Sequence, residues 1–194
     1  MPAHSVFRFA QILHLLSLAL WMGSTAMSGV VAAIVFPTMR KLDPTLGAYP
    51  DYTGDHAILG AGQIASKVFL AVDTIQFICA SLALGTFIVM LLCGYSLNTL
   101  ARVLRSILLC GALGLLSYHL LILMPAMNLD LRTYWDAAEI GNTVLADTHK
   151  DNFLAMHSTA SRTIGGITLV VLVTFFLGLW TAEHPKVSNA PEPA

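Results

Sequence analysis

The stretch FLAMHSTASRTIGGITLVVLVTFFLGLWT, residues 153–181, decides the fold class of this chain. Its second part is an apolar run that continues to Thr181, and about 20 mostly apolar residues suffice to cross a bilayer as a helix. His157 and Arg162 lie in its first part, where an ionisable side chain is costly unless it has a partner or a water-filled cavity. The sequence therefore predicts a membrane-spanning helix that forms one wall of a polar site.

Three further segments, at residues 7–36, 63–94 and 101–126, are also long and apolar enough to span a bilayer. Each must be helical, because lipid cannot satisfy open backbone groups and four spans are too few for a closed strand barrel. We expect an all-α fold, an integral membrane four-helix bundle. It forms a single domain over residues 1–182, followed by a disordered tail at 183–194.

Composition supports a membrane protein and excludes a nucleic-acid partner. The 194 residues are 56% hydrophobic and 11% charged, whereas a soluble domain carries roughly 25% charged residues. Lys plus Arg number 10 against 11 Asp plus Glu, so the chain has no strong net field to attract a polyanion. The lipid bilayer is the partner that this composition implies.

The connecting segments set the expected topology. Pro37 and the Pro/Gly-rich residues after it are expected to end the first helix, and a short interfacial helix is expected near Tyr134 to Ile140. The segments expected on the two sides of the membrane contain equal numbers of basic residues. The short 95–105 connection, with Arg102 and Arg105, counts most in the positive-inside rule, so we expect both termini in the cytoplasm.

Helix depth selects candidate site residues. Asp73 lies about 15 Å into the second predicted span, and Arg162 about 14 Å into the fourth, from the same side. His119 of the third span falls in the same layer, while His157 lies nearer the mouth. These depths predict an Asp73–Arg162 ion pair, which is either a structural lock between helices or part of a polar cavity.

Two cofactors suit these residue types. Imidazole and carboxylate are ligands for transition metals, so Asp73, His119 and His157 form one possible metal set, although no close ligand spacing supports it. Haem b would need axial histidines, and His14, His119 and His157 are the candidates. The competing interpretation is that the histidines are hydrogen-bonded packing residues. No catalytic triad, phosphate loop or dinucleotide motif occurs.

Short motifs at both ends resemble a known family. HLLSLALWMG at 14–23, VFP at 35–37 and FLAMHSTASRTIGG at 153–166 are similar to the transmembrane-protein-205-like domain of small bacterial membrane proteins. His14, Trp21, Gly23, Pro37 and His157 carry the match, and the resemblance implies a four-span bundle without an established reaction. The first span also resembles copper-resistance D-type and HemJ-type proteins, and the latter would assign haem binding to His14.

These observations predict a multi-pass protein of a bacterial inner membrane, not an enzyme. Its expected role is an accessory or a small-ligand or metal-handling factor with a buried centre of Asp73, Arg162 and histidines. Four short-looped helices enclose little volume, so a homo-oligomer or other membrane subunits are expected. The alternatives are a haem b-binding redox protein and a structural subunit of a larger complex.

Overall fold

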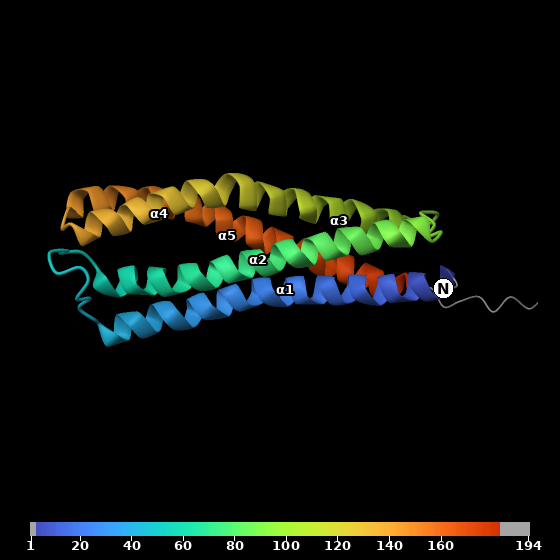
Figure 1. The fold of residues 1–194 in the computed structure, drawn as a ribbon, viewed down its shortest axis with the longest axis horizontal. Helices are drawn as coiled ribbons and strands as arrows, with labels where there is room; N and C mark the ends of the chain where they lie inside the picture. Colours follow the sequence, from blue (N-terminus) through green and yellow to red (C-terminus); the bar gives the residue numbers. More distant parts are fainter. Residues whose placement is uncertain (1–2, 183–194) are drawn as a thin grey trace, which may run out of the picture.

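The computed structural model describes residues 3–182, which form helices joined by short connections (Figure 1). The elements are α1 (Ala3–Leu42), α2 (His56–Leu92), α3 (Leu100–Tyr118), the π-helical turn η1 (His119–Leu123), α4 (Met124–Glu139) and α5 (Thr143–Trp180). Because α3, η1 and α4 are continuous, the described residues form four rods, each long and apolar enough to cross a membrane, and contain no strand. The predicted all-α four-helix membrane bundle is confirmed.

The rods run beyond the predicted spans. The third rod continues to Glu139 instead of ending at 126, and α5 begins at Thr143 instead of 153. The predicted interfacial helix near Tyr134 is therefore the last part of α4. The apolar pattern marks only the lipid-facing part of a helix, whereas these extensions are stabilised by packing of the two helices on each other. The predicted tail at 183–194 lies outside the described residues.

Pro37 does not end the first helix, contrary to the prediction. It lies inside α1, which continues to Leu42. A proline removes one backbone hydrogen bond and costs roughly 3 kcal/mol within a helix. Packing offsets this cost: the Met39 Cε atom lies 2.8 Å from where a Cβ atom on Gly60 would stand, so the end of α1 fits closely against the start of α2.

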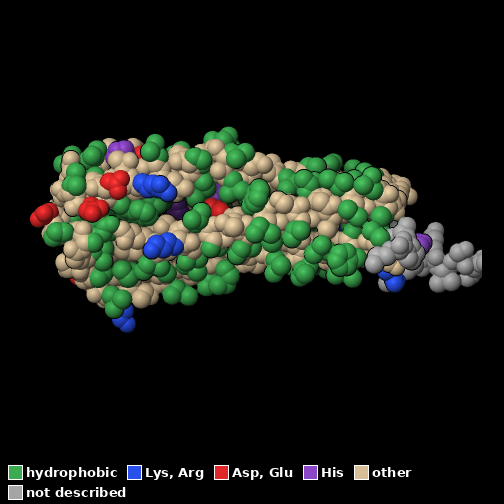
Figure 2. Space-filling model, in the orientation of Figure 1, with side chains coloured by type: hydrophobic (Ala, Val, Ile, Leu, Met, Phe, Trp, Pro, Cys, Tyr) green, Lys and Arg blue, Asp and Glu red, His purple; other side chains and the backbone are tan. Residues whose placement is uncertain are grey.

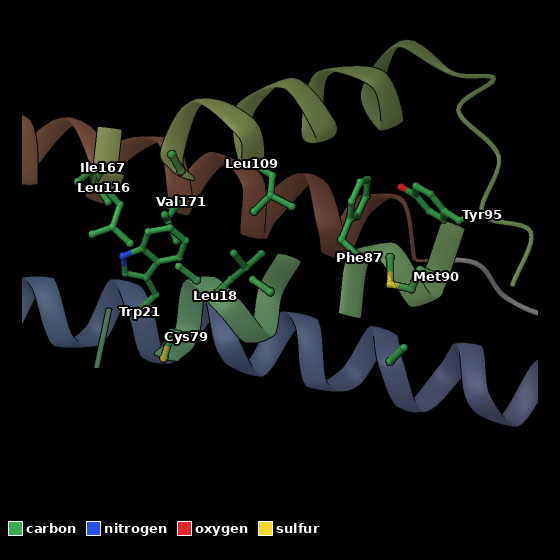
Figure 3. Close-up of a cluster of buried hydrophobic side chains, with 14 residues drawn as sticks. Leu18, Trp21, Cys79, Phe87, Met90, Tyr95, Leu109, Leu116, Ile167 and Val171 are labelled. Carbon is green, nitrogen blue, oxygen red and sulfur yellow. The ribbon is translucent and has the colours of Figure 1, made fainter. Parts of the chain in front are cut away.

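The helices pack in a ring with one weak seam. α1 packs along α2, and α5 contacts α1, α3 and α4, whereas α2 and α3 scarcely touch. Trp21 and Leu18 of α1 meet Leu109 of α3 and Val171 of α5 in the buried core (Figure 3). The short connection between α2 and α3 thus joins two helices that are not close neighbours along their lengths.

The rods are about twice as long as the hydrocarbon core is thick. Helices of 37–40 residues measure about 55–60 Å, against about 30 Å of hydrocarbon. Most charged side chains gather on the half that contains α4 and the α1–α2 loop (Figure 2). The charge-free stretches 74–92 and 163–180 each measure about 28 Å and match the hydrocarbon thickness. Asp73 and Arg162 therefore lie at its edge, and the charged half projects beyond it.

Trp21 tests this packing order. Its side chain is fully buried between helices, so Trp21→Ala should destabilise the bundle by about 3–5 kcal/mol. Trp180 is 85% exposed, and Trp180→Ala is the matched control, with an expected effect of about 0.5 kcal/mol or less. SDS-induced unfolding in mixed micelles measures both. Equal effects of the two substitutions would contradict the position of Trp21 in the core.

Candidate functional site

A chain of hydrogen bonds connects three rods near the middle of the bundle. Trp21 Nε1 on α1 donates to Gln76 Oε1 on α2 over 3.2 Å. Gln76 Nε2 donates to Asp73 Oδ1 over 3.1 Å, and His119 Nε2 lies 3.3 Å from that same oxygen. All four residues are at most 8% exposed. We call Trp21, Gln76, Asp73 and His119 the polar centre.

Local sequence positions each member of the polar centre. Asp73 and Gln76 are three residues apart on α2, so they share a helix face. His119 opens the π-helical turn η1, which Pro125 follows closely. Pro125 lacks an N–H and its ring would clash with the carbonyl four residues earlier, at Leu121. The wider π turn accommodates that proline, and such turns are frequent at functional sites.

The polar centre bridges the weak seam of the bundle. α2 and α3 scarcely touch, yet Asp73 of α2 meets His119 at the end of α3. The α1–α2 loop, residues 43–55, adds a second contact with the third rod in the charged half of the bundle, where the Tyr52 and Tyr134 hydroxyls lie 3.3 Å apart. A polar interaction therefore holds α2 near the third rod where backbone packing does not.

Two atoms of the polar centre remain without a partner. Oδ1 of Asp73 receives both hydrogen bonds, while Oδ2 has no hydrogen-bond partner among the described residues. His119 Nδ1 is buried and also lacks one. When the carboxylate is ionised, Nε2 of His119 carries the proton and Nδ1 of the neutral ring is an acceptor. Both free atoms are then acceptors, which suits a ligand that donates hydrogen bonds or is a cation.

The predicted Asp73–Arg162 ion pair is wrong. Arg162 is exposed, and Asp73 pairs with His119 instead. Ala160 and Ile167 define the buried face of α5, and Arg162 lies about 200° around the helix from Ala160. The depth of Arg162 agrees with that of Asp73, but its side chain points away from the bundle, where it can extend toward the polar boundary.

The predicted metal set is not assembled either. Within residues 3–182 no group of three or more His, Cys, Asp or Glu side chains could hold a metal ion. His157 is half-buried, and its ring stacks on Phe153 at a centroid distance of 5.4 Å. Of the predicted set, only Asp73 and His119 come together, because the His157 ring packs against its own helix.

His14 and His119 lie too far apart to bind one haem iron together. His14 Nδ1 lies 2.9 Å from the Ala83 carbonyl oxygen, whereas His119 contacts Asp73, which lies ten residues or about 15 Å from Ala83 along α2. One iron needs both ligating nitrogens within about 4 Å, since metal–nitrogen bonds are about 2 Å long. His14 and His119 cannot share it, and His157 faces Phe153.

Two polar clusters were not predicted from the sequence. Arg105, expected in the connection between spans, lies inside α3 with 0% exposure and donates to the Tyr95 hydroxyl over 3.3 Å. His149 Nδ1 lies 2.7 Å from Asp130 Oδ1 in the projecting half. Asp130 on α4 and His149 on α5 are 19 residues apart, on either side of the turn between these helices. Their pairing could have been predicted only if the ends of both helices had been known.

Two surface hollows of about 330 Å³ each lie at opposite ends of the bundle. One is lined by residues of the α1–α2 loop and the start of α2, including Asp55 and His56. The other lies at the start of α3 and the end of α5 and includes Thr99 and Thr181. Neither is lined by His14, His119 or His157.

Comparison of the chain with protein-family models, curated proteins and solved structures finds no match. The resemblance to the transmembrane-protein-205-like family therefore stays a prediction.

A double-mutant cycle tests the polar centre. Asp73→Ala and His119→Ala should show a coupling of roughly 0.6–1.7 kcal/mol, the range of interhelical hydrogen bonds in membranes, in SDS-induced unfolding. The cycle of Asp73→Ala with Arg162→Ala is the control. Arg162 is exposed and does not contact Asp73, so its cycle should be additive within about 0.5 kcal/mol. Coupling to Arg162 but not to His119 would contradict the observed pairing.

Proposed function

We propose that this protein is a non-enzymatic multi-pass protein of a bacterial inner membrane whose polar centre binds a small cation in exchange for a proton. The observation that carries the proposal is the buried, unpartnered His119 Nδ1 beside Asp73 Oδ2, which no described residue binds, on one hydrogen-bonded carboxylate–imidazole pair. Ionisable residues inside membrane proteins are rare and mark ion pathways and proton relays. A monovalent cation, such as a protonated amine, is the ligand class.

Charge balance favours exchange over simple binding. Without a cation, one proton shared by Asp73 and His119 makes the pair neutral overall, either as two neutral groups or as carboxylate and imidazolium. When a monovalent cation replaces that proton, the net charge stays zero. Burial of an uncompensated charge costs several kcal/mol, so exchange avoids a cost that addition of a cation alone would incur.

The position of the polar centre supports access from water. Asp73 lies at the edge of the charge-free stretch, and its side chain retains 10% exposure. With both termini in the cytoplasm, this edge and the projecting half of the bundle face the opposite side of the membrane. We propose that the cation arrives from that side.

The four rods alone provide at most a route for the cation from one side of the membrane to the polar centre. On the side of the polar centre where both termini lie, the residues form a packed apolar core around Leu18, Leu109 and Val171. A second copy or other membrane subunits would complete a route, so we propose an accessory or ligand-delivery role within an assembly.

Cation binding can be measured directly in nanodiscs of phosphatidylcholine. Sodium and a protonated alkylamine are titrated separately by calorimetry, with a pH indicator in weak buffer to record proton release. We expect at least one of them to bind with release of up to one proton per chain. Asp73→Asn should weaken that binding at least tenfold, or about 1.4 kcal/mol.

Asp130→Asn is the matched control because Asp130 also pairs with a histidine, His149, but in the projecting half. It should bind like the wild type. Failure of both cations to bind, or identical binding by Asp73→Asn, would refute the proposal. An absorption spectrum of the same sample covers the haem alternative: a stoichiometric Soret band that is lost in His14→Ala would favour the redox function instead.

A further inference from the structure

A second buried polar cluster lies at the end of the bundle opposite the charged half. Arg105 of α3 is fully buried, and its Nη1 atom lies 3.3 Å from the Tyr95 hydroxyl and 3.5 Å from Thr181 Oγ1. Its guanidinium lies 5.7 Å from the centroid of the Tyr95 ring, which Figure 3 shows beside Phe87. Within residues 3–182, no carboxylate lies within ion-pair distance of Arg105.

The guanidinium is only partly satisfied. Its Nε and Nη2 atoms have no hydrogen-bond partner, and its Cζ and Nη2 atoms lie 3.3 Å from where a Cβ atom on Gly178 would stand. Gly178 thus lets the guanidinium lie flat against α5. Burial of a charge without a counter-charge is strongly unfavourable, whereas a paired charge can be accommodated. The cluster therefore lacks a negative partner.

The adjoining hollow offers a place for that partner. It has a volume of about 330 Å³ and is lined by Thr99, Ala101, Arg102, Trp180, Thr181 and Ala182. Thr181 lines the hollow, and its hydroxyl lies 3.5 Å from Arg105 Nη1, so one residue connects the hollow to the buried charge. Thr99 caps the N-terminus of α3, where free backbone N–H groups and the helix dipole favour an anion.

We propose that this hollow binds a phosphate-type anion, with Arg105 as the buried counter-charge and Thr99 and Thr181 at its wall. The hollow lies where the apolar part of the bundle ends. Trp180 lines the hollow and is 85% exposed, as is typical of aromatic side chains at headgroup level. Basic pockets at such a boundary bind anionic lipid headgroups, so a phospholipid headgroup and free phosphate are the two sources of this chemistry.

Thermal unfolding of the full chain in nanodiscs separates the sources. One arm compares phosphatidylglycerol with phosphatidylcholine discs, and the other adds inorganic phosphate to phosphatidylcholine discs. We expect at least one probe to raise the unfolding midpoint of the wild type by roughly 5 °C. Arg105→Gln should lose most of that shift. Thr181→Val, which keeps the buried charge, should reduce the shift and serves if Arg105→Gln does not fold.

Arg132→Gln is the matched control: Arg132 is exposed at the other end of the bundle, and its loss removes the same charge. It should keep the full shift. A shift with phosphatidylglycerol alone identifies the lipid headgroup as the source, and a shift with inorganic phosphate alone identifies the free anion. Absence of any shift in the wild type, or equal shifts in the wild type, Arg105→Gln and Thr181→Val, would overturn the site.

Discussion

The hydrogen bond between Asp73 and His119 is the interaction on which the arrangement of the rods depends most. Apolar side chains gain little from leaving lipid for a helix interface, so polar contacts and close packing determine which membrane helices meet. All four rods contribute to one buried apolar core, but the α2 and α3 backbones approach each other closely at few positions. Asp73 fixes α2 to the third rod through His119, and Gln76 and Trp21 extend that connection to α1.

The same bond leaves the polar centre chemically incomplete. A structural lock would be expected to satisfy all its polar atoms, because an unsatisfied buried group costs about 1–3 kcal/mol. Here His119 Nδ1 is buried without a partner, beside a π-helical turn, while Oδ2 of the neighbouring Asp73, whose side chain is 10% exposed, is bound by no described residue. Free acceptors at a water-accessible depth explain why we infer cation binding rather than packing alone.

The sequence predicted the fold class and the depth of the polar centre, but not its partners. Composition and span length suffice for a membrane helix bundle, and helical rise placed Asp73 and His119 in one layer correctly. The direction of a side chain around its helix depends on which face packs inward. Depth therefore could not show that Arg162 points outward.

The remaining differences concern helix ends and helix faces. Arg105 was expected in the 95–105 connection, yet it lies on the buried face of α3, which starts at Leu100. Likewise Pro37 lies within α1, and α5 starts ten residues before the predicted span. Hydropathy reports contact with lipid, whereas the ends of these helices are decided by contacts between helices that a single sequence does not display.

The most direct test of this account is a distance measurement at the polar centre. Solid-state NMR in bilayers can record the dipolar coupling between ¹⁵N-labelled histidine and ¹³C-labelled aspartate carboxyl groups, with His119→Gln used to assign the signal. We predict a coupling between His119 Nε2 and the Asp73 carboxyl carbon that corresponds to about 4 Å. A spectrum in which His119 shows no coupling to Asp73 would contradict the account.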